Sequence, residues 1–312
     1  MKVLVTGGAG FIGSQLVDAL VGKGHEVTVF DNLSSGRMDF LQQHMKNPAF
    51  GFVKGDLLEK GAVGKHMKGV DMVFHLAANP DARAAIRDTS IDLNLETIAT
   101  YNVLEAMRRN DVRKIIFSSS GTVYGDAFSK PLAEDYGPLF PISLYGAGKL
   151  ASEGLVSAFC GTFGFQAWIY RFTNIVGPRA THGVIYDFVN KLKANPKELQ
   201  VLGNGTQAKP YLHVSDCVGG ILFGLEHAKD RVNCYHLAVE GATSVRKIAD
   251  WTAKYYGSGP KIIYGTDDHG WPGDISQVLL DTSKAKKLGW HASMTSDQAA
   301  ERAVREVVAE MK

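Results

Sequence analysis

The stretch KVLVTGGAGFIG (residues 2–13) opens the chain with a β-branched run followed by a glycine-rich loop. Gly8, Gly10 and Gly13 fit the spacing G-x-G-x-x-G, while Gly7, Gly10 and Gly13 fit the looser spacing G-x-x-G-x-x-G. Glycine allows the tight turn and the close approach of the backbone to a pyrophosphate. The N–H groups that begin the following helix attract the same anion. The pattern predicts a nucleotide-binding loop, and a glycine-rich turn without a ligand is the alternative.

Asp31 ends the second expected strand, 18 residues beyond Gly13. A carboxylate at this place accepts hydrogen bonds from the adenosine ribose and repels a 2′-phosphate, so it favours NAD over NADP. Arg37 follows six residues later and weakens that preference, but the glycine loop itself contains no Arg or Lys. We therefore expect NAD as the cofactor.

Strands and helices alternate through the first half of the chain. β-rich runs occupy residues 2–6, 26–30, 50–54, 72–76, 114–118 and 167–172, and helical patterns occupy 14–21, 98–109 and 145–163. This alternation predicts an α/β fold, a Rossmann-type doubly wound parallel sheet. We expect an NAD-binding domain of residues 1–173 plus about 214–240. A smaller α/β substrate-binding lobe is expected at about 174–213 and 241–312, ending in a helix over 296–311.

Composition excludes several functional classes. A net charge of +2, without a Lys/Arg block, argues against a nucleic-acid partner. No apolar run approaches the roughly 18 residues of a membrane span, and the N-terminal apolar stretch is too short for a signal peptide. The three cysteines have no metal-ligand spacing and suit reduced thiols. We expect a cytoplasmic enzyme without a metal.

Ser120, Tyr145 and Lys149 are the candidate catalytic residues. Tyr145 and Lys149 stand four residues apart, which places both on one face of a helix. A cation beside a phenol favours the phenolate, so we expect the pKa of Tyr145 to fall towards the range of a general base. The hydroxyl of Ser120 can bind the same substrate oxygen. The alternative is that Tyr145 and Lys149 are neighbours on a solvated helix face.

Together with Asp31-Asn32-Leu33-Ser34-Ser35-Gly36 and Tyr145-x-x-x-Lys149, the glycine loop makes the whole chain resemble the extended short-chain dehydrogenase/reductases. Within them it is most similar to the UDP-glucose 4-epimerase group. The resemblance implies cofactor contacts from Gly7, Gly10, Phe11, Ile12, Gly13, Asp31, Asn32, Ser34, Ser35, Gly36, Asp56, Leu57, Leu76, Ala77, Ala78, Ser118, Tyr145 and Lys149. It implies substrate contacts from Ser120, Asn174, Val184, Lys209, Tyr211, His269 and Asp274. A UDP-sugar substrate and a homodimer are further expectations of this resemblance.

Three positions depart from the family pattern. Lys209 stands where an Arg commonly clamps a phosphate, and Lys keeps the charge without the bidentate geometry. Trp271 stands where many members have a second phosphate-binding Arg, for which His269 is a partial substitute. Glu96 replaces a frequent cofactor-contacting Asn. Asn174, His269 and Asp274 also suit ordinary turn and surface roles.

The residues after Ser120 bear on the reaction. By the family pattern, a 4,6-dehydratase carries an acid pair directly after the Ser/Thr, and a decarboxylase carries an acid soon after it. Gly121 and Thr122 occupy the first two positions here. The remaining path is oxidation of the sugar at C4, rotation of the 4-keto sugar and return of the hydride to the other face. We therefore expect a 4-epimerase of UDP-glucose and UDP-galactose.

Two other functions stay open. A non-catalytic NAD-binding regulator is expected to lack Tyr145 or Lys149, and this chain has both. A net oxidoreductase has the same residues and differs by consuming its cofactor.

Overall fold

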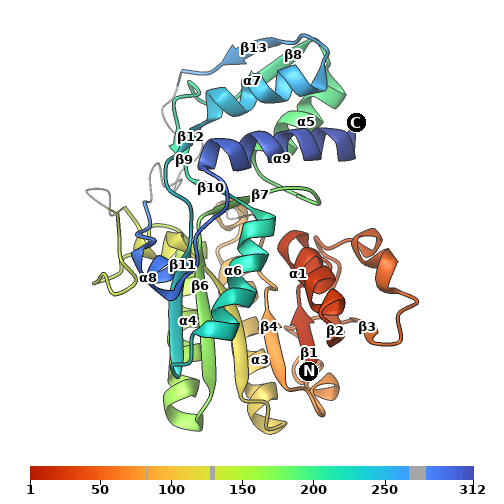
Figure 1. Cartoon of the computed structure of the whole chain (residues 1–312), viewed down its shortest axis with the longest axis vertical. Coiled ribbons are helices and arrows are strands. Elements are labelled where there is room, and N and C mark those ends of the chain that lie inside the picture. Colours follow the sequence, from red (N-terminus) through yellow and green to blue (C-terminus); the bar gives the residue numbers. More distant parts are fainter. Residues whose placement is uncertain (82, 127–130, 267–278) are drawn as a thin grey trace.

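The structure, a computed structural model, describes residues 1–81, 83–126, 131–266 and 279–312. A large lobe is built on a central sheet, and a smaller lobe lies beyond one end of that sheet (Figure 1). The central sheet comprises β1 (Lys2–Thr6), β2 (Glu26–Asp31), β3 (Phe50–Lys54), β4 (Met72–His75), β5 (Lys114–Ser120), β6 (Gln166–Phe172) and β11 (Val232–Leu237).

All seven strands are parallel, in the order β11-β6-β5-β4-β1-β2-β3. The chain proceeds outward from β1 to β3 and then returns to place β4 on the other side of β1. A crevice forms at such a reversal, at the carboxyl ends of the strands, and ligands of doubly wound sheets bind there. The arrangement confirms the predicted Rossmann-type parallel sheet.

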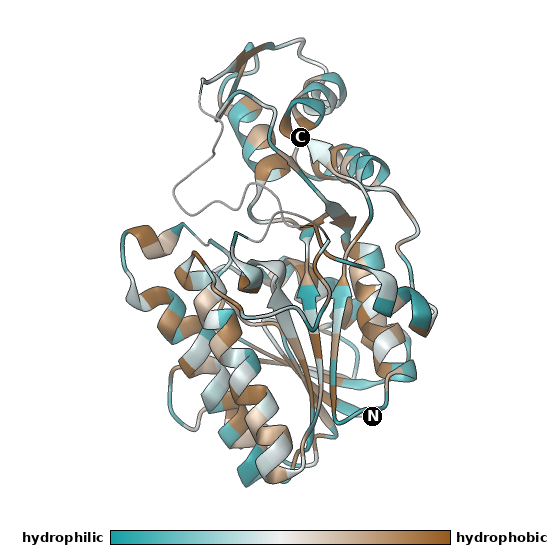
Figure 2. Cartoon of the chain, turned by 90° about the vertical axis from the view of Figure 1, so that its left-hand side faces the viewer, coloured by the Kyte–Doolittle hydropathy of each residue, from teal (hydrophilic) through white to brown (hydrophobic). Residues whose placement is uncertain are grey.

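Helices cover both faces of the sheet because its strands are apolar on both sides. In β1, Val3 and Val5 face one core and Leu4 faces the other. The first core contains side chains of α1 (Phe11–Gly22) and α6 (Val214–His227), and the second contains side chains of α3 (Ala99–Arg109) and α4 (Leu144–Phe163). Figure 2 shows hydrophobic colouring along the strands between the helices.

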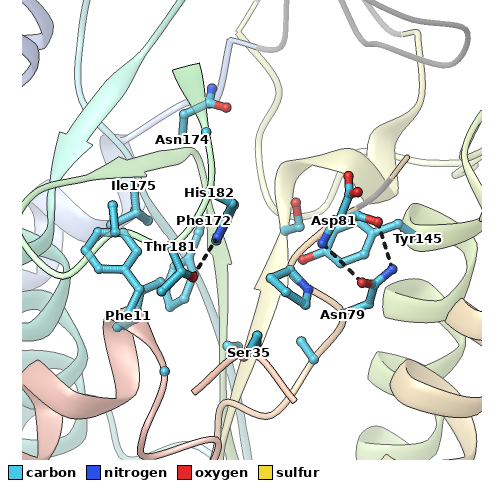
Figure 3. A pocket seen from close by; sticks show the side chains of 18 of the residues that line it. Phe11, Ser35, Asn79, Asp81, Tyr145, Phe172, Asn174, Ile175, Thr181 and His182 are labelled. Carbon is cyan, nitrogen blue, oxygen red and sulfur yellow. Dashed lines mark hydrogen bonds between the residues drawn. The ribbon is translucent and has the colours of Figure 1, made fainter. Parts of the chain in front are cut away.

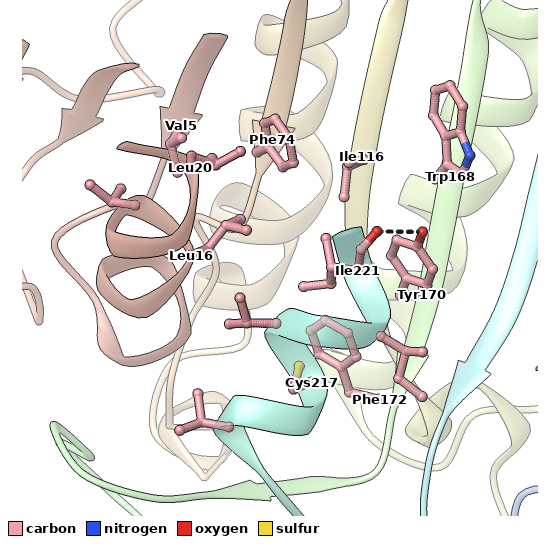
Figure 4. Close-up of a cluster of buried hydrophobic side chains, with 14 of the residues drawn as sticks. Val5, Leu16, Leu20, Phe74, Ile116, Trp168, Tyr170, Phe172, Cys217 and Ile221 are labelled. Carbon is pink, nitrogen blue, oxygen red and sulfur yellow. Dashed lines mark hydrogen bonds between the residues drawn. The ribbon is translucent and has the colours of Figure 1, made fainter. Parts of the chain in front are cut away.

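A polar contact fixes α6 within the first core. The hydroxyl of Tyr170 in β6 donates to the carbonyl of Ile221 at 3.0 Å, surrounded by apolar side chains such as Phe172 and Cys217 (Figure 4). The bond satisfies a buried phenol that would otherwise be costly to desolvate. The short elements of this lobe are η1 (Met38–His44), η2 (Val63–His66), η3 (Ala84–Ile86), α2 (Ser90–Asp92), η4 (Leu93–Ile98) and η5 (Gly121–Tyr124).

The smaller lobe has its own apolar core between three helices and a two-stranded sheet. Its helices are α5 (Val184–Ala194), α7 (Val245–Tyr256) and α9 (Ser296–Met311). Its strands pair as β8 (Glu198–Val201) with β13 (Lys261–Tyr264), β7 (Asn174–Val176) with β10 (Tyr211–His213), and β9 (Ala208–Lys209) with β12 (Thr243–Ser244). A capping box of Thr295 and Gln298 starts α9 at the predicted residue.

The division into two lobes stays our proposal, with one refinement at the C-terminal side. Ala285 of α8 (Ser283–Leu288) and Trp290 pack into the first core, beside Leu237 of β11. We therefore propose that residues 279–292 belong with the large lobe rather than with the substrate lobe. Within the described residues, none of the helices has the length and apolar character needed to cross a membrane.

Candidate active site

A cavity of about 660 Å³ opens at the carboxyl ends of the central strands and extends to the smaller lobe. Every expected cofactor contact lines this cavity except Gly36. Gly36 packs against Ala9 and Asp31 so closely that a Cβ at this position would lie 2.9 Å from atoms of both residues. Five of the expected substrate contacts also line the cavity: Ser120, Asn174, Val184, Lys209 and Tyr211. His269 and Asp274, like Trp271, lie outside the described residues. Residues that were expected to bind one cofactor and one substrate, from segments far apart in the chain, therefore line a single cavity.

The glycine loop joins β1 to the N-terminus of α1 and lines the cavity. Gly7, Gly10 and Gly13 face the cavity and Gly8 does not, so the looser of the two spacings describes the lining. Gly8 instead packs against Val29 of the neighbouring strand. A Cβ on Gly13 would lie 2.1 Å from the carbonyl oxygen of Gly7, so a side chain there is excluded. This cradle and the free N–H groups of the helix start fit a dinucleotide pyrophosphate.

Asp31 lies at the end of β2 and is only 8% exposed. Its two carboxylate oxygens accept hydrogen bonds from the backbone N–H groups of Ala9 at 3.0 Å and Leu33 at 2.8 Å. Burial raises the pKa of Asp31, and the two hydrogen bonds oppose that rise. Arg37, which weakened the expected preference for NAD, pairs with Asp39 and does not line the cavity.

Tyr145 and Lys149 lie in the first turns of α4, whose N-cap is Ser143. The hydroxyl of Ser143 accepts the N–H of Gly146 at 3.1 Å, which fixes where the helix begins. Nζ of Lys149 lies 5.6 Å from the centre of the Tyr145 ring and donates to the carbonyl of Ser118 at 2.9 Å. Both side chains therefore face the cavity, not a solvated surface.

Ser120 ends β5, two residues later than the strand end expected from the sequence. Its Oγ accepts the N–H of Thr122 at 3.2 Å and caps the short turn that follows. Gly121 and Thr122, at the positions where the family pattern implies acids in a dehydratase, line the cavity. Among the described residues, Oγ1 of Thr122 is buried without a hydrogen-bond partner.

The expected fall in the pKa of Tyr145 is wrong for the protein alone. Burial raises the pKa of Tyr145 to about 12, although Lys149 lowers it. The carboxylates of Glu96 and Asp92 add to the rise. The sequence argument counted the nearby cation and missed the loss of water and the two acids, because neither can be read from the spacing of Tyr145 and Lys149.

Glu96 contacts Lys149 in the structure, and this contact was not predicted from the sequence. Its Oε2 lies 2.8 Å from Nζ of Lys149, and both side chains are almost fully buried. Its Oε1 accepts the backbone N–H of Asn79 at 2.7 Å. Glu96 had drawn notice only as a departure from a family pattern, and its partner lies 53 residues away in the sequence.

Figure 3 shows Tyr145, Asn79 and Asp81 along one side of the cavity in that view, with Asn174 and His182 along the other. Asn79 and Asp81 belong to the loop that follows β4, and the amide of Asn79 holds that loop through a 3.0 Å bond to the carbonyl of Asp81. Burial lowers the pKa of His182. The position of Asn79 and Asp81 after a central strand was a sequence signal for these two residues, whereas no motif singled out His182.

Short strands of the smaller lobe form the part of the cavity where substrate contacts were expected. Asn174 lies in β7 opposite Tyr211 in β10, and its amide donates to the carbonyl of Pro210 at 3.2 Å. The backbone N–H of Tyr211 is held by the hydroxyl of Ser296 at the start of α9. Lys209 reaches the same cavity from β9.

Comparison with known proteins gives a consistent match over the whole chain. Residues 3–237 match the model of the NAD dependent epimerase/dehydratase family. A putative UDP-glucose 4-epimerase of Methanocaldococcus jannaschii is 32% identical over 308 residues, which cover 97% of each chain. A UDP-glucuronic acid decarboxylase of Arabidopsis thaliana is 30% identical over 95% of this chain and 67% of that protein.

The solved structures that resemble this chain include an epimerase and a dehydratase. A UDP-galactose 4-epimerase has a TM-score of 0.89 and 40% identity, with 100% of both chains covered. A dTDP-glucose 4,6-dehydratase from Streptomyces venezuelae, solved with NAD bound, has a TM-score of 0.88 and 27% identity, covering 98% of this chain and 96% of that one. The NAD bound in the dehydratase agrees with the glycine loop that lines the cavity here.

Proposed function

Because the chain belongs to the NAD-dependent epimerase/dehydratase family, whose cofactor is NAD, we propose that it is a nucleotide-sugar 4-epimerase that interconverts UDP-glucose and UDP-galactose. The observation that carries the proposal is the convergence of Ser120, Tyr145 and Lys149 on one cavity, with Gly121 and Thr122 in place of acids. Such a site can move a proton and a hydride but has no carboxylate at these positions to eliminate water.

In the proposed mechanism, Tyr145 as phenolate takes the proton of the sugar C4 hydroxyl and later returns it. The hydroxyl of Ser120 donates to the same oxygen and holds it at the phenol. The glycine loop and Asp31 would hold NAD, which when bound would supply the acceptor for the C4 hydride and the donor for its return to the opposite face of the 4-keto sugar. Lys149 offsets the negative charge of the phenolate through its proximity to the ring.

We propose that the nucleotide diphosphate binds between the two lobes. Lys209 supplies a positive charge at this side of the cavity, and Asn174 supplies an amide donor. Val184 of α5 and Tyr211 of β10 line the same cavity, which supports the proposal that they contact the nucleotide. The relative from M. jannaschii and the solved UDP-galactose 4-epimerase support UDP as the nucleotide.

A homodimer and a cytoplasmic location complete the proposal. Large apolar side chains stay exposed on and beside α3 and α4, among them Ile98, Tyr101 and Leu144, each 40–44% exposed. We propose that a second copy of the chain covers them, as the family resemblance implies, since large apolar side chains left in water favour an interface. The cysteines are free, which suits a reducing compartment.

The test is incubation of the purified protein with UDP-glucose, UDP-galactose and their N-acetyl forms, without added NAD. The proposal predicts interconversion of glucose and galactose donors with catalytic, co-purified cofactor. Accumulation of NADH in proportion to product identifies an oxidoreductase instead. A 4-keto-6-deoxy product identifies the dehydratase alternative. Release of carbon dioxide in a parallel incubation with UDP-glucuronate identifies the decarboxylase alternative.

A further inference from the structure

Glu96 lies in an unusual piece of helix. Residues Leu93–Ile98 form a π-helical stretch between α2 and α3. Such stretches are rare, and they occur frequently at functional sites. The carbonyl of Glu96 accepts hydrogen bonds from the hydroxyls of Ser152 at 2.9 Å and Thr100 at 2.5 Å. Two hydroxyls from different helices therefore support the backbone at the residue that points its carboxylate at Lys149.

The close approach of two helices brings Glu96 to Lys149. Gly148 of α4 faces the π-helical stretch, and a Cβ at this position would lie only 2.8 Å from the Cβ of Glu96. A larger residue at 148 would separate the helices and lengthen the 2.8 Å contact between Oε2 of Glu96 and Nζ of Lys149. Because Gly148 has no side chain, the two helices can approach closely enough for Glu96 and Lys149 to form their ion pair.

Several charged and polar groups surround the ammonium of Lys149. Glu96 and Asp92 face it from the π-helical stretch and α2, and Tyr145 and Glu153 face it from its own helix. The carbonyl of Ser118 and the ring of Phe117 face it from β5, and His75 faces it from β4. Burial lowers the pKa of Lys149, but Glu96 and Tyr145 outweigh that effect and the pKa ends above its usual value.

We propose that Glu96 is a positioning residue that anchors the ammonium of Lys149 in the wall of the cavity and limits how much of its charge acts on the phenol of Tyr145. Both oxygens of Glu96 act as acceptors, one from the ammonium and one from the N–H of Asn79, and among the described residues neither faces an acceptor for a carboxyl proton. Burial raises the pKa of Glu96, and Lys149 and the N–H of Asn79 oppose that rise by favouring the carboxylate. The carboxylate neutralises the lysine and also ties it to the loop after β4. The inference rests on the proposed function, because it assigns Tyr145 the role of general base.

Replacing Glu96 with a neutral residue should lower the pKa of Tyr145. In Glu96→Gln the ammonium keeps the carbonyl of Ser118 and the new amide oxygen as acceptors and Asp92 as a nearby anion, so it stays charged. The phenol of Tyr145 then experiences a positive charge that Glu96 no longer offsets, and its phenolate is favoured. Removing one charge at this range in a mostly buried site lowers the pKa of Tyr145 by about one unit or more.

Two measurements test this inference. The first is a carbon NMR titration of protein labelled at the tyrosine ζ-carbon, in which the signal of Tyr145 is assigned by its loss in Tyr145→Phe. The second is the pH dependence of kcat/KM for the sugar interconversion. We expect Glu96→Gln to move both the phenol titration and the acidic limb of the profile to lower pH by about one unit, whereas Glu96→Asp, which keeps the charge, leaves both near the wild-type values.

Glu153→Gln is the matched control, since Glu153 is a buried carboxylate of the same helix whose own partner is Arg171. It is expected to lower the melting temperature and to leave the titration of Tyr145 in place, because Glu153 acts on the ammonium of Lys149 but is not among the groups that shift the pKa of Tyr145. If the pKa of Tyr145 in Glu96→Gln is equal to or higher than that of the wild type, the inference is overturned. If Glu96→Gln does not fold, Glu96→Asn, with the residue frequent in the family, serves in its place. A wild type that turns over no sugar contradicts the proposed function, whereas the phenol titration still decides the role of Glu96.

Discussion

Nζ of Lys149 and Oε2 of Glu96 lie 2.8 Å apart, with both side chains at most 2% exposed. A buried ion pair of this kind makes a modest net contribution to stability, but breaking it is costly because one charge is left without a partner. The pair joins α4, which carries Tyr145, to the π-helical stretch and the loop after β4. The position of the proposed catalytic lysine is therefore set from outside its own helix.

Tyr145→Phe removes the proposed general base without changing the shape of the ring. We expect kcat for the interconversion of UDP-glucose and UDP-galactose to fall by about 10²–10⁴-fold, the usual contribution of a positioned acid–base group. Tyr255→Phe is the control, because the Tyr255 hydroxyl bonds to Glu301 in the smaller lobe. A fall of less than about tenfold in Tyr145→Phe contradicts the assignment.

Lys149→Met leaves the carboxylate of Glu96 buried without its cation. We expect the free energy of unfolding to fall by about 3–5 kcal/mol, the usual cost of breaking a buried pair. Adding Glu96→Gln to Lys149→Met should recover part of that loss, because the uncompensated charge is gone. Urea denaturation of the two single variants and the double variant measures the coupling. Strictly additive losses would show that the pair has no energetic coupling.

In Asp31→Asn, an amide NH₂ takes the place of one carboxylate oxygen and cannot accept its backbone N–H. The substitution also removes the negative charge that is expected to face the ribose. We expect binding of NAD to weaken by about tenfold or more, which is about 1.4 kcal/mol, and the preference for NAD over NADP to shrink. Calorimetric titration of cofactor-stripped protein with each dinucleotide measures both effects. Asp39→Asn, whose carboxylate pairs with exposed Arg37, is the control. Unchanged selectivity in Asp31→Asn would contradict the proposed ribose contact.

His75 should make the fold sensitive to acid. It is fully buried between Thr6 and Thr100, and burial together with Lys149 lowers its pKa to about 3. In the unfolded chain it takes up a proton below about pH 6.5, so stability falls as pH drops from there towards 3.

Between pH 6.5 and 5, His75 should account for a loss of about 2 kcal/mol in the free energy of unfolding. Denaturation of the wild type and of His75→Gln at pH 7 and pH 5 isolates this contribution, because other buried histidines such as His213 act in the same direction in both proteins. Equal pH dependence in the two proteins would contradict the prediction.

Tyr101→Asp and Leu144→Asp place charges among the exposed apolar side chains on and beside α3 and α4. If a second copy of the chain covers them, each variant should shift the protein towards monomer, because a charge buried in an interface without a partner is costly. Light scattering coupled to size-exclusion chromatography measures the mass. Ile263→Asp, at a residue of comparable exposure in β13, is the control. A dimer that survives both substitutions places the interface elsewhere.

The elements of the large lobe were predictable because their signals are local. The expected strands at 2–6 and 50–54 agree with β1 and β3, and the expected final helix agrees with α9. Strand ends were less predictable: β5 continues to Ser120 because it pairs with β6 as far as Phe172. The position of α8 against the first core also depends on contacts with β11 and not on its own sequence.

By itself, the sequence determined the Rossmann-type sheet and the glycine loop, since both follow from periodicity and short spacings. Most of the other residues that were expected to face the cavity came from the family resemblance. Only the tertiary structure decided that Gly36 lies outside the lining and that Arg37 is paired away from it. It also decided the charge balance at Tyr145, where desolvation and two acids outweigh the nearby cation. Electrostatic interactions in a site depend on burial and on distances between remote segments, and Glu96 meets Lys149 only when two helices pack at Gly148.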